Sequence, residues 1–142
     1  MNIAVDASLC RGCEACMLAC ALVHEGISNP LLSRVLVSKD MAHYTFEIIL
    51  CQQCAEPACI QACPANAILQ DDRGVTAIQE PDCIQCGLCA EDCPYRAIFY
   101  DLAADRYFKC DLCPQLPSGP ACVNICPVGA LSLQSATGLV EV

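Results

Sequence analysis

Short apolar stretches separated by polar turns recur along this chain, and each stretch is only long enough for a strand. Weak alternation of apolar and polar residues predicts a first strand at Asn2–Val5. The segments Leu31–Val37 and Tyr44–Leu50 are apolar and rich in β-branched or aromatic residues, which favours two further strands. Because the polar residues Lys39–Asp40 lie between these two segments, we expect them to form a hairpin.

The rest of the chain repeats one order three times: a cysteine group, a Cys-Pro pair, two residues, an alanine, a large apolar residue and then a strand. An Asp-Arg-Gly turn at 72–74 predicts a hairpin around it, and a second turn is expected at 101–105. The strands that this repeat predicts lie near 67–69, 75–78, 97–100, 107–108 and 130–133. The tail Gln134–Val142 is expected to be a closing strand or a partner contact.

The segment 21–50 has no counterpart in the other quarters of the chain. Ala21–Glu25 is predicted to continue a helix from the first cysteine group, and Gly26 is predicted to end it. The run Ser28–Pro30 is expected to be a loop. The segment as a whole is either ordinary core packing or an interface element.

Sixteen cysteines fall into four groups, and no cysteine is left over. The third group reads CIQCGLCAEDCP at 83–94, which is the C-x2-C-x2-C-x3-C-P run that holds a 4Fe-4S cluster in bacterial ferredoxins. The first group lacks the proline, and the second and fourth have longer central gaps. The members, in chain order, are Cys10, Cys13, Cys16 and Cys20; Cys51, Cys54, Cys59 and Cys63; Cys83, Cys86, Cys89 and Cys93; and Cys110, Cys113, Cys122 and Cys126. At four thiolates per cluster, this pattern predicts four 4Fe-4S clusters.

Other uses of cysteine fit the pattern less well. A secreted disulfide scaffold is disfavoured because residues 1–9 lack a signal-peptide pattern and C-x2-C pairs make poor structural disulfides. Zinc sites also use C-x2-C pairs, but usually as two separated pairs. A Rieske cluster needs paired histidines. His24 and His43 lie outside the cysteine loops, so we expect both to be surface or interface residues.

The formal net charge is −9, and four clusters with their thiolates would add roughly −8 or more. So acidic a chain is not expected to bind nucleic acid, which requires patches of lysine and arginine. It is expected to attract a redox partner with a basic face. No apolar run approaches the roughly 18 residues of a membrane span, so no span of its own is expected. The mean hydropathy of +0.45 favours an obligate interface or self-association.

Lys109 and Arg96 are two basic residues that lie near cysteines in the sequence. Lys109 directly precedes Cys110, and Arg96 follows Cys93 by three positions. Either charge is a candidate for raising the reduction potential of a nearby cluster, and the alternative for both is an ordinary solvated charge.

In this order, the four groups resemble those of the four-cluster ferredoxin-like iron-sulfur subunits of molybdenum and tungsten oxidoreductases. That family includes the beta subunits of dimethyl sulfoxide reductase and formate dehydrogenase, and the small subunits of tungsten aldehyde oxidoreductases. The resemblance covers about residues 3–133, and its most specific part is the stretched fourth motif KCDLCPQLPSGPACVNICP at 109–127. It implies an α+β fold, a duplicated bacterial-ferredoxin-like fold with short strands and short helices around four iron-sulfur clusters. It also implies a single domain over 1–142, made of two pseudo-symmetric two-cluster units with an insert at 21–50.

The wiring of the family, carried over by position, pairs the first cysteine group with the fourth and the second with the third. The ligand sets that the resemblance implies are Cys10, Cys13, Cys16 and Cys126 for cluster 1; Cys20, Cys110, Cys113 and Cys122 for cluster 2; Cys51, Cys54, Cys59 and Cys93 for cluster 3; and Cys63, Cys83, Cys86 and Cys89 for cluster 4. Sequence spacing alone leaves open a pairing of the first group with the second and of the third with the fourth.

The resemblance implies a non-catalytic electron-transfer subunit docked on a larger catalytic subunit with a molybdenum or tungsten cofactor. Electrons would pass between that active site and a second redox partner. The shortness of the chain favours a soluble, cytoplasmic complex, with the tungsten aldehyde oxidoreductase type as the nearest expectation. The alternatives are a free-standing polyferredoxin, a hydrogenase or carbon monoxide dehydrogenase electron carrier, and a cluster-containing assembly or scaffold protein.

Overall fold

The computed structural model describes residues 1–135 and 138–139, in which short strands alternate with short helices. The strands are β1 (Asn2–Val5), β2 (Val35–Asp40), β3 (Thr45–Leu50), β4 (Ile68–Gln70), β5 (Thr76–Ile78), β6 (Phe99–Asp101), β7 (Arg106–Phe108), β8 (Leu131–Ser135) and β9 (Gly138–Leu139). The α-helices are α1 (Ala15–Glu25), α2 (Ala58–Ala62), α3 (Leu88–Asp92) and α4 (Ala121–Ile125), and two 3-10 turns lie at Pro30–Leu32 and Glu80–Asp82. The structure is therefore a small mixed α and β fold.

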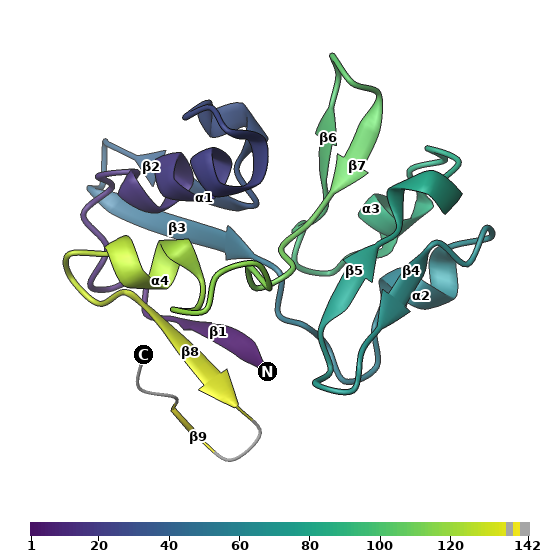
Figure 1. The fold of residues 1–142 in the computed structure, drawn as a ribbon. Helices are drawn as coiled ribbons and strands as arrows, with labels where there is room; N and C mark the ends of the chain where they lie inside the picture. The colour runs from purple at the N-terminus through teal and green to yellow at the C-terminus, as the bar shows by residue number, and fades with distance from the viewer. Residues whose placement is uncertain (136–137, 140–142) are drawn as a thin grey trace.

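The strands form one sheet and three separate hairpins. In the sheet, β1 pairs antiparallel with β8, and β9 adds to the other edge of β8. The hairpins are β2–β3, β4–β5 and β6–β7. Because β1 pairs with β8, the first and last parts of the described chain lie in one lobe, where α1 packs on α4 (Figure 1). The middle of the chain forms the other lobe, where α2 packs on α3 beside β4 and β5 (Figure 1).

The sequence repeat after each Cys-Pro pair has a backbone counterpart. The residue three positions after the cysteine has a positive φ in every copy: 53° at Asn66, 56° at Arg96 and 65° at Gly129. The alanine that comes next is buried in all three copies, at 67, 97 and 130. A left-handed residue thus ends the turn and directs the chain into the following strand.

One arginine connects the β6–β7 hairpin to both lobes. The guanidinium of Arg106 lies 2.5 Å from a carboxylate oxygen of Glu25 at the end of α1, and 2.9 Å from one of Glu80. It also contacts Asp101 across its own hairpin at 3.3 Å. The pKa of Arg106 is raised, chiefly by the hydrogen bond to Glu25, so this charge is held at all ordinary pH values.

The predicted hairpin within 21–50 is present, but its turn lies elsewhere. Lys39 and Asp40 belong to β2, where they pair with Phe46 and Thr45, and the turn is at 41–44. The first strand of this hairpin was predicted to begin at Leu31. Leu31 lies instead in a 3-10 turn, and β2 begins only at Val35. The prediction that the preceding helix ends at Gly26 is confirmed.

The inward side of this hairpin belongs to the main core. Val35, Val37, Ile49 and Leu50 are all buried there, together with Ile3 of β1. The segment 21–50 therefore packs into the core.

For the tail Gln134–Val142, only a part of the prediction falls on described residues. Strand β8 ends at Ser135, and Gly138–Leu139 forms β9, so a closing strand is present. Residues 136–137 and 140–142 lie outside the described part of the chain. Among the described residues, no helix has the length and apolar character needed to span a bilayer.

Replacing Leu50 by alanine should destabilise the protein strongly, because its side chain is only 2% exposed at the base of β3. Truncation of a buried leucine typically costs about 2–5 kcal/mol. Leu31 is 82% exposed in the same segment, so Leu31→Ala should stay within about 0.5 kcal/mol of the parent. Anaerobic thermal unfolding of both variants measures the difference, and equal midpoints would show that the hairpin is not part of the core.

Candidate metal centres

All sixteen cysteines lie within the described residues, and none of them forms a disulfide there. Each group begins with a loop of the same shape, since the residue two positions after the first cysteine has a positive φ. These residues are Gly12, Gln53, Gln85 and Leu112. In three groups the N–H of this residue donates to the sulfur of the first cysteine at 3.4 Å: Gly12 to Cys10, Gln53 to Cys51 and Leu112 to Cys110. The loop thus directs backbone dipoles at sulfur.

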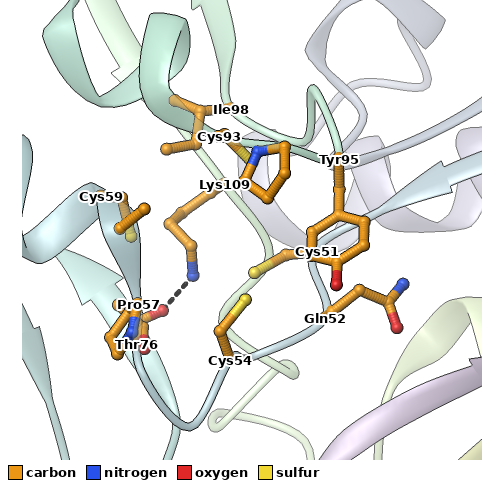
Figure 2. A pocket seen from close by; sticks show the side chains of 12 residues that line it. Cys51, Gln52, Cys54, Pro57, Cys59, Thr76, Cys93, Tyr95, Ile98 and Lys109 are labelled. Carbon is orange, nitrogen blue, oxygen red and sulfur yellow. Dashed lines mark hydrogen bonds between the residues drawn. The ribbon is translucent and has the colours of Figure 1, made fainter.

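Two cavities in the middle lobe are each lined by four thiols. Quartet 3 (Cys51, Cys54, Cys59 and Cys93) lines one cavity together with Thr76 and Lys109 (Figure 2). Quartet 4 (Cys63, Cys83, Cys86 and Cys89) lines the other. Each cavity therefore collects three thiols from one sequence group and one thiol from its neighbour, so the structure brings the second and third groups together.

The thiols of the first and fourth groups also gather in two sets. In quartet 1 (Cys10, Cys13, Cys16 and Cys126), burial raises the pKa of Cys16 to about 11. The thiols of the other three members lie close enough to raise that pKa further. In quartet 2 (Cys20, Cys110, Cys113 and Cys122), burial raises the pKa of Cys122 far above its ordinary value, and the other three thiols add to the effect.

These sites fit iron-sulfur clusters, although their burial makes isolated thiolates unfavourable. A soft metal centre is the partner that deprotonates grouped cysteines and compensates their charge. The cavity of quartet 3 also contains the hydroxyl of Thr76, which is buried and has no hydrogen-bond partner among the described residues. An iron-sulfur cluster in this cavity could bind the four thiolates. It could also accept hydrogen bonds from the backbone N–H groups and from the Thr76 hydroxyl.

His24 is a residue that the sequence analysis placed wrongly. Its side chain is 5% exposed, whereas that of His43 is 77% exposed as expected. The His24 Nε2 lies 2.9 Å from Asp111 Oδ1. Its Nδ1 lies 2.9 Å from the carbonyl oxygen of Cys20 and 3.7 Å from the sulfur of the same residue. His24 follows Cys20 by four positions on α1, and this helical spacing was the available signal.

The contact with His24 changes the pKa of the Cys20 thiol. Burial by itself would raise the pKa of Cys20, but hydrogen bonds from His24 and from the Arg34 N–H outweigh it. The pKa of Cys20 is therefore lowered, unlike that of Cys122 in the same quartet. Arg34 also contacts Asp111 at 3.3 Å, which completes a polar network beside quartet 2.

Lys109 and Arg96, the two candidates for raising the reduction potential of a cluster, differ in their surroundings. Lys109 is 2% exposed, and its ammonium donates to the carbonyl oxygens of Thr76 and Cys110. The solvated interpretation is therefore wrong for Lys109. Arg96 carries a side chain that is 69% exposed and pairs with Glu47 at 3.1 Å, so it is a solvated charge.

The comparisons with known proteins agree with this chemistry. A family model described as a 4Fe-4S dicluster domain matches residues 42–136, and one described as a 4Fe-4S binding domain matches residues 7–22.

Two curated relatives align with nearly the whole chain. The beta subunit of the NADH-dependent phenylglyoxylate dehydrogenase of Aromatoleum evansii is 41% identical over 92% of this chain, which spans only 29% of that protein. The thiosulfate reductase electron transfer subunit of Salmonella typhi is 31% identical over 89% of this chain and 71% of that protein.

Among solved structures, the active-site complex of benzoyl coenzyme A reductase with benzoyl-CoA contains a similar chain. The TM-score is 0.60 at 30% identity, and the match covers 99% of this chain and 81% of that one. The resemblance expected from the cysteine motifs is confirmed.

Replacing Gly12 by alanine should loosen quartet 1, because its Cβ would lie 2.6 Å from the Phe46 ring. Gly26 is the matched control: its φ of 74° resembles the 70° of Gly12, but its Cβ would meet nothing within 4 Å. Both variants pay the left-handed cost of about 1–2 kcal/mol. Only Gly12→Ala should release iron faster to a chelator. Equal release rates would mean that the close approach of Phe46 plays no part.

Proposed function

The chain belongs to the 4Fe-4S dicluster domain family, and we propose that it is a non-catalytic electron-transfer subunit carrying four 4Fe-4S clusters. The observation that carries this proposal is the gathering of sixteen free thiols into four quartets. Each bound cluster would accept and release one electron. In this proposal the chain supplies the thiolates that hold these groups.

The ligands in this proposal are the sixteen cysteines of quartets 1 to 4. The cavities of quartets 3 and 4 support the pairing of the second group with the third. The proximity of Cys126 to Cys16 supports the pairing of the first group with the fourth. The two lobes then correspond to two pseudo-symmetric two-cluster units within one domain over 1–142, and the packing of α1 on α4 and of α2 on α3 supports this division.

The quartets follow one another as a path. Where two quartets meet, the pKa of one thiol is raised mainly by burial. A thiol of the neighbouring quartet raises the same pKa further. These neighbours are Cys16 for Cys122, Cys51 for Cys110 and Cys59 for Cys89. These neighbours support a path in the order quartet 1, 2, 3 and 4. Cys13 of quartet 1 and Cys86 of quartet 4 are exposed, so the two ends of the path are accessible to partners.

The partners in this proposal are a larger catalytic subunit with a molybdenum or tungsten cofactor and a second redox protein, in the cytoplasm. The relatives named for phenylglyoxylate dehydrogenase and thiosulfate reductase, and the benzoyl coenzyme A reductase complex, support a place within an oxidoreductase assembly. Ile84 and Leu88 are exposed beside Cys86, which gives this end an apolar contact surface. The net charge of −9 favours a basic face on the second partner.

A tagged chain purified without oxygen should bring down a larger subunit that contains molybdenum or tungsten. Metal analysis and mass spectrometry of the complex identify the partner. Elution of the chain alone as a reducible monomer would favour a free polyferredoxin, and clusters that no reductant can reduce would favour a scaffold.

Iron analysis of cysteine variants tests the pairing. The parent should contain about sixteen irons per chain, and the variant with Cys16→Ala and Cys126→Ala should lose about four, because both residues belong to quartet 1. The control with Cys16→Ala and Cys89→Ala should lose about eight. If the first group were paired with the second, both double variants would lose about eight.

A further inference from the structure

The buried amine of Lys109 lies between two quartets. Its backbone precedes Cys110 of quartet 2, and its side chain reaches into the cavity that quartet 3 lines (Figure 2). Figure 2 shows the side chain surrounded by Cys51, Cys54, Cys59 and Cys93, with the ammonium directed at the carbonyl oxygen of Thr76. The second acceptor is the carbonyl oxygen of Cys110, at 2.9 Å.

This ammonium has no carboxylate partner among the described residues. Among the described residues, the lysine and arginine side chains that form ion pairs lie at the surface or belong to the Arg34 and Arg106 networks. A buried, unpaired charge is unfavourable unless an anion lies nearby. The groups that surround Lys109 and become anionic are the thiols of quartet 3.

We propose that Lys109 is the fixed positive charge that compensates the group held by quartet 3 and favours its reduced form. This inference rests on the proposed function, because it requires a cluster at quartet 3. One electron arriving there from a neighbouring quartet, which is thereby oxidised by one electron, adds one negative charge beside the ammonium. The attraction is strong because Lys109 is only 2% exposed, so water screens its charge little.

The positive charge of Lys109 already influences the surrounding thiols. At Cys59, burial raises the pKa and the charge of Lys109 opposes that rise more than any other group. Lys109 also lowers the pKa of Cys54, where its effect is smaller than those of burial and of the neighbouring thiols Cys51 and Cys93. Arg96 is not among the main influences on the pKa of Cys54 or Cys59, and its side chain is 69% exposed. Burial and direction, rather than nearness in sequence, distinguish the two cations.

The experiment is a redox titration followed by electron paramagnetic resonance on anaerobically loaded protein. Lys109→Met removes the charge and keeps a flexible apolar side chain, whereas Lys109→Arg keeps the charge. Arg96→Met removes a charge of the same sign from the surface near the same quartet. Cys59→Ser identifies the signal of quartet 3, since it alters a ligand there. Iron per chain is measured for every variant before titration.

In Lys109→Met, the ratio of reduced to oxidised quartet 3 at a fixed potential should fall about tenfold, which corresponds to about 59 mV for a one-electron couple. Lys109→Arg and Arg96→Met should stay within about threefold of the parent. Selective loss of about four irons in Lys109→Met, restored in Lys109→Arg, would equally support charge compensation.

Two results would overturn the inference. One is an unchanged quartet 3 signal in a fully loaded Lys109→Met variant, and the other is the same iron loss in both Lys109 variants, which would indicate a role in shape alone. Neither result affects the proposed function, which fails separately if the parent itself binds no iron.

Discussion

The need to bury sulfur ligands in groups of four determines most of this structure. Half of the sixteen cysteines are buried, and they occupy core positions that aliphatic side chains fill in other small domains. The helices α2, α3 and α4 have five residues each, which is too short for stability on their own. Each of them carries one cysteine within it and ends at another, so ligand binding holds both. We therefore expect folding and cluster binding to be coupled in this chain.

Local features of the sequence predicted the parts of the fold that local interactions determine. The Cys-Pro pairs, the Asp71–Gly74 turn and the buried alanines all depend on residues within a few positions of one another. The turn of the β2–β3 hairpin was misplaced because Lys39 and Asp40 are polar enough to suggest a turn. Instead, the carboxylate of Asp40 accepts hydrogen bonds from the N–H groups of Ala42 and His43, so it stabilises the turn from the last position of the strand.

The surroundings of the charged residues could not be predicted in the same way. His24 is buried because it meets Asp111, which lies 87 positions away, and Lys109 is buried because β5 supplies the carbonyl of Thr76. Both contacts connect segments that the fold alone brings together. The role of the cysteines as ligands can be predicted from the sequence because the motif itself contains them. The polar groups around them come from strands and helices that are distant in the sequence, so they cannot be predicted in this way.

The distribution of these charges follows from the electrostatics of buried redox centres. Adding an electron to a buried site is opposed by desolvation, which is greatest where water is farthest away. Quartets 1 and 4 each include an exposed cysteine, so water itself stabilises added charge at the two ends of the path. Quartets 2 and 3 contain no exposed cysteine, and basic side chains with little exposure lie beside both. His24 and Arg34, which share Asp111 as a partner, lie beside quartet 2, and the buried Lys109 lies beside quartet 3. In the proposed path, this placement of positive charge would lower the cost of adding an electron to the two inner quartets.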